Sequence, residues 1–158
     1  MTLPCDLADG VVLRRATAAD LPALVRLLAD DQLGTARDGG DLTPYRRAFA
    51  AIDTDPAQLL VVAEADGAVV GTLQLTIIPG LARRGALRAQ VEAVRVGADR
   101  RGRGLGGAMM AWVIEEARRR GCALVQLTTD KRRTDAHRFY ERLGFAASHE
   151  GMKLLLGD

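Results

Sequence analysis

The residues of this chain best suited to chemistry lie between positions 88 and 107. A carboxylate, Glu92, stands in an otherwise apolar run, and glycines and arginines crowd residues 97–107. Glycine lets backbone N–H groups approach an anion with no Cβ in the way, and guanidinium groups add charge-assisted hydrogen bonds. A helix that begins at such a turn adds the positive end of its dipole. The stretch therefore predicts a cradle for a diphosphate beside an acid–base group.

Residues 102–107 also satisfy G-x-G-x-x-G, the dinucleotide-binding fingerprint. That fingerprint belongs to a first β-α unit with a parallel sheet built after it. Here it starts at residue 102 of 158, behind a predicted antiparallel hairpin, and too little chain follows for such a sheet. Asp130 could stand in for the acidic ribose-binding residue, but the position of the motif disfavours a Rossmann unit.

Apolar periodicity predicts the elements that hold this turn in place. Residues 65–68, with Asp66-Gly67 at their centre, are expected to join two strands as an antiparallel hairpin. Thr17 and Thr43 are expected to cap the first two helices, and residues 30–41 and 79–85 to form loops. The expected strands are residues 11–15, 58–64, 69–78, 87–96 and 123–129, with one or two final strands over 145–156, and the later helices are 105–120 and 135–143.

The predicted order is β-α-α-β-β-β-α-β-α-β. It combines an antiparallel meander with one β-α-β crossover, so we predict an α+β (mixed α/β) fold. Its sheet should be central, mixed and mostly antiparallel, with about four flanking helices. The chain has 158 residues and no repeat or linker, so residues 1–158 are expected to form a single domain.

Composition disfavours several classes of function. The net charge is only +2 and aromatic residues make up 4%, so the arginines, with no interleaved aromatic residues, do not favour nucleic-acid binding. No run approaches the roughly 20 apolar residues of a membrane span, and the N-terminus lacks a signal-peptide core, so a cytoplasmic protein is expected. Cys5 and Cys122 indicate neither a disulfide framework nor a metal site, and Cys122 is expected to be a buried thiol.

Two motifs together resemble one known family. Arg101-x-x-Gly104-x-Gly106, placed between a strand and a helix, is similar to the pyrophosphate-binding motif (Arg/Gln-x-x-Gly-x-Gly/Ala) of the GNAT superfamily of acyl-CoA N-acyltransferases. Residues 136–145, AHRFYERLGF, look like the A-x-x-F-Y-x-x-x-G-F signature common in these enzymes. The resemblance covers most of the chain. One departure is Arg133, which stands where many members carry a cofactor-contacting Asn.

The resemblance implies a GNAT-like fold and acetyl-CoA as co-substrate, and no metal is expected because the lone His137 and His149 lack metal-ligand spacing. It also implies that one backbone segment pairs with the pantetheine arm and polarises the acetyl carbonyl, while the glycine–arginine turn holds the diphosphate. On this sequence the first segment is Val94, Arg95 and Val96, and the second is Arg101, Gly102, Arg103, Gly104, Leu105 and Gly106.

Transfer of an acetyl group to an amine needs a base, because an alkylamine with a pKa near 10.4 is mostly protonated at neutral pH. Glu92 is the candidate base. It shares strand parity with Val94 and Val96, so a half-buried environment is expected; a neighbouring arginine or a bulge that turns it to solvent is the alternative. Tyr140 is the candidate acid, as the family resemblance implies. It also lies on an apolar helical stripe, so a core position remains open.

The acceptor is expected to be a primary amine of a small molecule or peptide. The sequence leaves open which amine this is, whether other acyl-CoAs are used, and whether the chain forms a homodimer. A catalytically silent acyl-CoA sensor or regulatory module is the alternative function. The presence of both Glu92 and Tyr140 favours catalysis over that alternative.

Overall fold

A six-stranded sheet with the spatial order β1-β2-β3-β4-β5-β6 organises the fold in this computed structural model, which describes residues 1–30 and 37–157. Its strands are β1 (Cys5–Asp6), β2 (Val12–Arg15), β3 (Gln58–Ala65), β4 (Ala68–Ile78), β5 (Leu87–Val96) and β6 (Cys122–Leu127). The helices are α1 (Leu21–Ala29), α2 (Thr43–Thr54), α3 (Ala82–Gly85), α4 (Leu105–Arg119) and α5 (Thr134–Arg142), with 3₁₀ turns η1 (Ala18–Asp20) and η2 (Ala98–Arg100). The chain divides into two compact units, Met1–Gln126 and Leu127–Asp158.

The sheet is mixed and mostly antiparallel, as predicted. Strands β1 to β5 pair antiparallel with their neighbours, and α4 connects β5 to β6 as a crossover. The predicted hairpin is confirmed: β3 and β4 meet at Asp66 and Gly67, whose φ values are +52° and +75°. Both central residues of a type I′ turn need positive φ, which Asp-Gly tolerates well.

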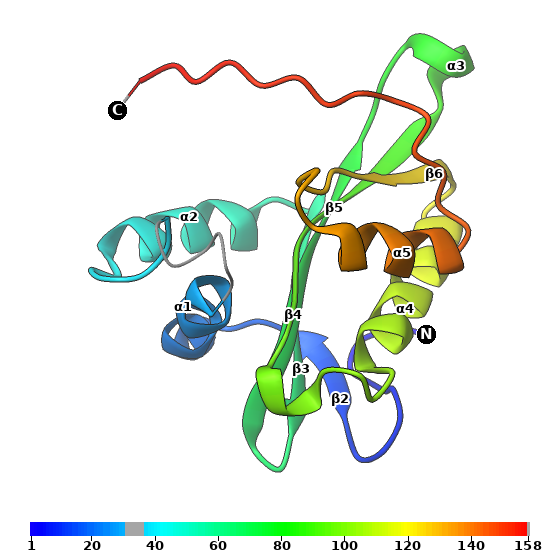
Figure 1. The fold of residues 1–158 in the computed structure, drawn as a ribbon. Coiled ribbons are helices and arrows are strands. Elements are labelled where there is room, and N and C mark those ends of the chain that lie inside the picture. Colours follow the sequence, from blue (N-terminus) through cyan, green and yellow to red (C-terminus); the bar gives the residue numbers. More distant parts are fainter. Residues whose placement is uncertain (31–36, 158) are drawn as a thin grey trace. The chain divides into compact units, whose positions relative to one another are not determined.

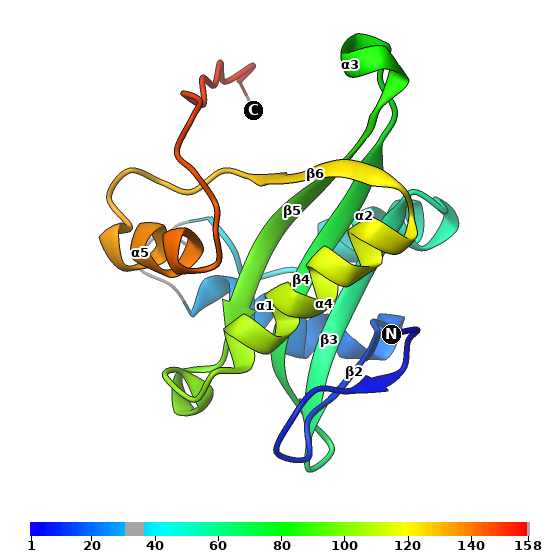
Figure 2. The ribbon, with the colours of Figure 1, turned by 90° about the vertical axis from the view of Figure 1, so that its right-hand side faces the viewer.

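Helices cover both faces of the sheet (Figure 1). Helices α1 and α2 lie on one side, called here the α1/α2 face, and α4 crosses the other side, called the α4 face (Figure 2). On the α4 face, Trp112 and Met109 are at most 1% exposed. On the α1/α2 face, a second buried cluster contains Ala16, Leu21, Leu24, Phe49 and Val62. The predicted apolar stripe of α1 is buried except at Leu28, which is half-buried.

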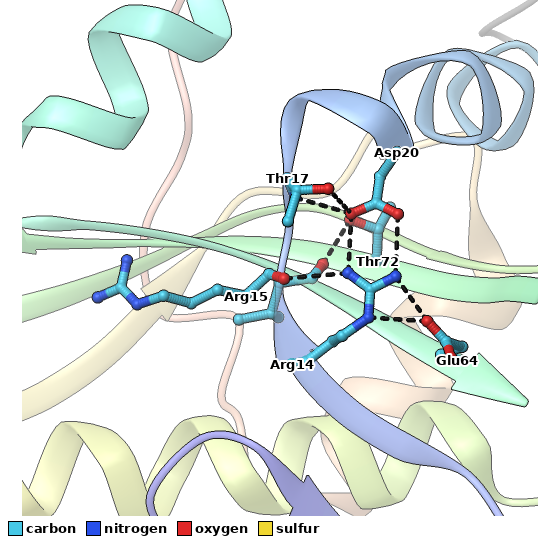
Figure 3. A network of polar contacts seen from close by, with 7 residues as sticks. Arg14, Arg15, Thr17, Asp20, Glu64 and Thr72 are labelled. Carbon is cyan, nitrogen blue, oxygen red and sulfur yellow. Dashed lines mark hydrogen bonds and ion pairs between the residues drawn. The ribbon is translucent and has the colours of Figure 1, made fainter. Parts of the chain in front are cut away.

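An ion-pair network fixes the start of α1 against the sheet (Figure 3). The Arg14 guanidinium donates to both Asp20 carboxylate oxygens, at 2.8 and 2.9 Å, and to Glu64 at 2.8 Å. Asp20 also accepts from the Thr17 backbone N–H at 2.7 Å, which completes the predicted capping box. The hydrogen bonds from Arg14 hold the pKa of Asp20 below its usual range. The network therefore joins β2, β3 and the first turn before α1.

Two predicted segments differ in the structure. Residues 79–85 contain α3 instead of an unbroken loop, and Arg83 and Arg84 there take left-handed φ values of +55° and +60°. Residues 145–157 form no strand, and Met152, Leu154, Leu155 and Leu156 in that segment are 85–93% exposed. A strand needs a partner edge as well as apolar residues, so local sequence predicted the final strands wrongly. Half of the predicted loop over residues 30–41, namely residues 31–36, lies outside the described residues.

Smaller differences concern element ends. Helix α2 begins at Thr43 itself, and the Asp41 carboxylate accepts hydrogen bonds from the Thr43 backbone and hydroxyl, both at 3.0 Å. Asp41 therefore does the capping that was expected of Thr43. Strand β6 ends at Leu127, two residues before its predicted end.

Candidate active site

The glycine–arginine turn joins the end of β5 to the first turn of α4. Gly102 and Gly104 take left-handed φ values of +75° and +83°, and a Cβ added at either position would meet no atom within 4 Å. The glycines are therefore required by backbone conformation and not by lack of space. The first helical hydrogen bond runs from the Ala108 N–H to the Gly104 carbonyl at 3.0 Å. Helix geometry leaves the N–H groups before it without helical partners.

The six residues predicted to contact the diphosphate are consecutive, 101–106, and they form this turn. Gly104 occupies the N-cap position of α4 and supplies no side chain to cap the helix. Backbone amides at the positive helix end and nearby guanidinium groups form a combination that suits an anion.

Arg101 also has partners inside the fold. Its Nε donates to the Val96 carbonyl at 3.1 Å, and its Nη2 donates to the Asp30 carbonyl at 3.2 Å. The Asp30 carboxylate lies 3.6 Å away, and the Arg101 side chain is 54% exposed. Arg101 thus ties the end of β5 to the end of α1 while its guanidinium remains accessible to solvent.

A cavity of about 410 Å³ adjoins the turn, and sequence reasoning missed it. Arg100, Arg103 and Gly104 line one side of it. Arg100 is held by ion pairs with Asp66 at 3.6 Å and Asp99 at 3.9 Å. The remaining lining residues are Leu105 and Ala108 of α4 and Leu7, Ala8, Asp9 and Val11 of the β1–β2 connection. The turn dipeptide Asp9-Gly10, with positive φ at both residues, was the available signal for that connection.

A β-bulge in β5 breaks the predicted parity between Glu92 and the valines that follow it. Gln74 pairs with Glu92 and Thr72 pairs with Arg95, so β5 has one residue more than β4 between the two pairs. The bulge contains Ala93, whose φ is +52°. Such an insertion breaks the alternation of side chains along a strand.

The expected half-buried environment of Glu92 is therefore corrected. Glu92 is exposed, whereas Val94 and Val96 are half-buried. Glu92 and Arg95 pair with residues of the α1/α2 face, and Val96 pairs with Gly71 of the α4 face. The alternative considered from sequence, a bulge that reverses parity and turns Glu92 to solvent, is the one the structure has.

A second cavity, of about 180 Å³, lies on the α1/α2 face of the sheet. Gln74 and Ala93 line it next to the position of Glu92. The other lining residues come from α1, α2 and the facing strands: Leu21, Leu24, Val25, Leu28, Tyr45, Ala48, Phe49, Ile52, Leu60 and Thr72. The Glu92 position thus adjoins a mainly apolar space. Sequence reasoning did not anticipate this cavity, because it depends on how two helices pack on the sheet.

Tyr140 belongs to the second compact unit and lies in α5. It is half-buried, and its ring makes edge-to-face contacts with Phe139 and Phe145, with centroid distances of 5.0 and 5.8 Å. The chain turns back after α5 at Gly144, whose φ is +92°, and the Phe145 N–H donates to the Tyr140 carbonyl at 3.1 Å. The F-Y-x-x-x-G-F motif therefore builds a small aromatic cluster around Tyr140.

The segment before α5 is organised by Asp130. Its carboxylate accepts hydrogen bonds from the Arg132 side chain and backbone, each at 2.9 Å, and these hold the pKa of Asp130 far below its usual range. Arg133 occupies the N-cap position of α5, and its N–H donates to the Asp130 carbonyl at 2.9 Å. His137 Nε2 lies 3.1 Å from the same carbonyl oxygen.

Neither cysteine is fully buried: Cys5 and Cys122 are free, half-buried thiols, and burial raises the pKa of both. Within residues 1–30 and 37–157, no group of three or more His, Cys, Asp or Glu side chains is placed to hold a metal ion. No helix of these ranges has the length and apolar character needed to cross a bilayer.

Comparison with known proteins places the chain among acetyltransferases. The acetyltransferase (GNAT) family matches residues 21–145. An aminoalkylphosphonate N-acetyltransferase of Salmonella typhimurium is 33% identical over 87% of this chain and 86% of its own length. A glucosamine 6-phosphate N-acetyltransferase of Trypanosoma brucei brucei is 36% identical over 56% of this chain and 58% of its own length.

A solved structure supports the fold. The crystal structure of a transcriptional regulator from Bacillus halodurans C-125 is 47% identical, with a TM-score of 0.89, and the match covers 92% of this chain and 99% of that chain.

Proposed function

Because this chain belongs to the acetyltransferase (GNAT) family of acetyl-CoA-dependent N-acetyltransferases, we propose that it transfers an acetyl group directly to a primary amine of a small molecule or peptide. The observation that carries the proposal is the turn at residues 101–106, where two left-handed glycines directly precede the first turn of α4. A direct transfer uses one site for both substrates and needs no acyl-enzyme intermediate.

The backbone of the turn is proposed to bind the diphosphate of the co-substrate. Amides of Leu105 and Gly106 at the helix start are the candidate donors, and Arg101 and Arg103 supply positive charge. The segment Val94, Arg95 and Val96 is proposed to pair with the pantetheine arm, as the family resemblance implies. The bulge at Ala93 supports this role, because a strand that leaves its regular ladder has backbone groups to offer a ligand.

Glu92 is proposed as the general base and Tyr140 as the general acid. The amine nitrogen attacks the thioester carbonyl carbon, so a C–N bond forms and the C–S bond breaks. Glu92 takes a proton from the amine through water, and Tyr140 gives a proton to the departing thiolate. An exposed carboxylate is readily reached by water, which fits a base that acts through a water molecule.

The names of the two curated relatives suggest a class of acceptor. Both relatives are named for amines that also carry a phosphorus oxyanion, a phosphonate or a phosphate. On this chain Arg88 is half-buried in β5, four residues before Glu92 and on the same face. At about 3.3 Å per strand residue their Cα atoms are roughly 13 Å apart, within reach of a long side chain and a small ligand. We infer that Arg88 contacts the anionic end of such an acceptor.

The test measures release of the CoA thiol from acetyl-CoA with a panel of amines. The panel includes an aminoalkylphosphonate, glucosamine 6-phosphate and simple alkylamines. Glu92→Gln and Tyr140→Phe should each lower kcat by about 10²- to 10⁴-fold. Glu115→Gln is the matched control, because Glu115 is 54% exposed on α4 and pairs with Arg118. Turnover unchanged by both substitutions would overturn the assigned roles.

A second candidate is a regulatory acyl-CoA sensor. The observation that favours it is the name of the 47% identical protein of solved structure, a transcriptional regulator. Calorimetry with acetyl-CoA, combined with the thiol-release assay, separates the two candidates. A sensor would bind acetyl-CoA and turn over none of the amines, whereas an enzyme would bind acetyl-CoA and release its thiol.

A further inference from the structure

Gln74 stands directly across from the proposed base. The register of β4 and β5 pairs Gln74 with Glu92, and both residues belong to the α1/α2 face. Directly opposed residues of an antiparallel pair have Cβ atoms about 4.5 to 5.5 Å apart. Whatever approaches the Glu92 carboxylate along this face therefore also meets the Gln74 amide.

Gln58 holds the Gln74 amide in one orientation. Gln74 Nε2 donates to Gln58 Oε1 at 3.0 Å, and the Thr76 hydroxyl donates to the same oxygen at 2.8 Å. The Gln74 nitrogen thus points toward β3, and turning this amide alone would set two acceptor oxygens against each other. Gln58 thus acts as a positioning residue for Gln74.

In this orientation the Gln74 oxygen is not used in the hydrogen bond to Gln58. Gln74 Oε1 accepts no hydrogen bond from the described residues, while its nitrogen is engaged with Gln58. Gln74 is half-buried and lines the cavity of about 180 Å³ on the α1/α2 face. A carbonyl oxygen that borders a mainly apolar space beside a carboxylate suits a ligand with several N–H donors.

We propose that Gln74 binds the acceptor amine through Oε1, as a second hydrogen-bond acceptor beside Glu92. A primary amine has two N–H bonds even in its neutral, reactive form, one for Gln74 Oε1 and one for the water molecule that links it to Glu92. A secondary amine has one, so it can satisfy only one of the two. The pair Gln74 and Glu92 therefore selects primary amines. This inference rests on the proposed function, because it assumes that the amine is acetylated beside Glu92.

The experiment compares a primary amine acceptor with its N-methyl derivative in full-length protein. Gln74→Met keeps the length of the side chain and removes the amide. We expect it to raise KM for the primary amine about tenfold or more, the effect of losing one hydrogen bond to a charged or reacting group. KM for acetyl-CoA should stay within about twofold of wild type. The ratio of kcat/KM for the primary amine to kcat/KM for the N-methyl derivative should fall toward one.

Gln126→Met is the matched control. Gln126 Nε2 donates to Gln90 Oε1 at 2.7 Å, so this variant also removes an amide–amide bond between side chains of the sheet. Its KM values and its preference for the primary amine should match those of wild type. Gln58→Met should give a partial version of the Gln74→Met effect, because it frees the Gln74 amide to rotate.

The outcomes separate the two claims. Normal wild-type turnover with an unchanged amine KM and unchanged preference in Gln74→Met would overturn the role of Gln74 and leave the proposed function standing. Absence of wild-type turnover with every amine, despite binding of acetyl-CoA, would overturn both. Equal changes in Gln74→Met and Gln126→Met would assign the effect to sheet stability, and the inference would fall.

Discussion

Glu92 and Asp20 show how differently two carboxylates of one sheet are used. Glu92 lies exposed beside a bulge, with Gln74 across from it on β4. Asp20 is 8% exposed and accepts hydrogen bonds from Arg14 and Thr17. The first arrangement leaves a carboxylate open to substrate and water. The second consumes its hydrogen-bonding capacity within the fold and makes that carboxylate structural.

Asp20→Asn is expected to destabilise the protein by about 1 to 3 kcal/mol at neutral pH, because it removes a charge from a largely buried, hydrogen-bonded pair. The pKa of Asp20 is lower in the folded protein than in the unfolded chain. Its stabilising contribution is therefore complete above the unfolded value near 3.9 and is lost as pH falls through the lower, folded value. Urea unfolding of wild type and variant at a series of acid pH values measures how this contribution to the free energy of unfolding depends on pH.

The difference in the free energy of unfolding between wild type and Asp20→Asn should become smaller as the solution is acidified. Asp53→Asn serves as the control, because Asp53 is exposed on α2, and its effect should stay within about 0.5 kcal/mol at every pH. If the difference in the free energy of unfolding between wild type and Asp20→Asn stayed constant down to strongly acid pH, the charge of Asp20 would not be what stabilises the fold.

At the scale of elements, the turn before α4 depends on backbone conformation. Gly104 takes a left-handed φ at the N-cap, and Gly107 lies within the first turn of the helix. A Cβ has open space at both positions. The two glycines thus differ in backbone geometry alone, which makes them a matched pair for substitution.

Gly104→Ala should cost about 1 to 2 kcal/mol of stability, the penalty of a left-handed conformation for an L-residue. Gly107→Ala should stabilise the protein by up to about 1 kcal/mol, since alanine is the better helix former. Thermal unfolding shows whether Gly104→Ala is destabilised and Gly107→Ala is stabilised. Calorimetry with CoA should show weaker binding for Gly104→Ala, because strain at the N-cap turns the first amides of α4 away. A loss of stability in both variants would show that space, and not backbone conformation, governs the turn.

At the scale of the whole molecule, stability depends on the contact between α4 and the sheet. Gly71 of β4 allows this approach, since a Cβ there would lie 3.1 Å from Met109 Sδ and 3.2 Å from the Arg95 carbonyl oxygen. Trp112 is 1% exposed in the same layer, and its Nε1 donates to the Met1 carbonyl at 3.2 Å. The same helix presents the glycine–arginine turn at its start, so its packing on the sheet also positions that turn.

Trp112→Ala should therefore lower the free energy of unfolding by about 3 to 5 kcal/mol, as expected for removing a buried aromatic side chain. Trp112→Phe, which keeps a ring, should cost less. Denaturation followed by circular dichroism measures both, since the variants lack the only tryptophan of the chain. Met152→Ala is the control, because Met152 is 93% exposed, and a comparable loss in that variant would contradict this account.

The local features of this protein follow directly from short stretches of its sequence. The Asp66-Gly67 hairpin, the capping box of Thr17 and Asp20, and the glycine turn before α4 were all predicted and are present. Each depends on the conformational preferences of a few consecutive residues, which the sequence states directly. The motifs at residues 101–106 and 136–145 likewise predicted the acetyltransferase family, and the family match over residues 21–145 confirms it.

The face that each β5 side chain takes, and the residues around it, depend on long-range pairing in the folded protein. Glu92 lies opposite Gln74, a residue that sequence reasoning did not select, and the bulge at Ala93 then breaks the predicted parity of Glu92 with Val96. Strand register depends on pairing with a distant segment, so a single inserted residue moves every later side chain to the other face. The two cavities and the unpaired segment 145–157 have the same origin, because each depends on segments far apart in the chain.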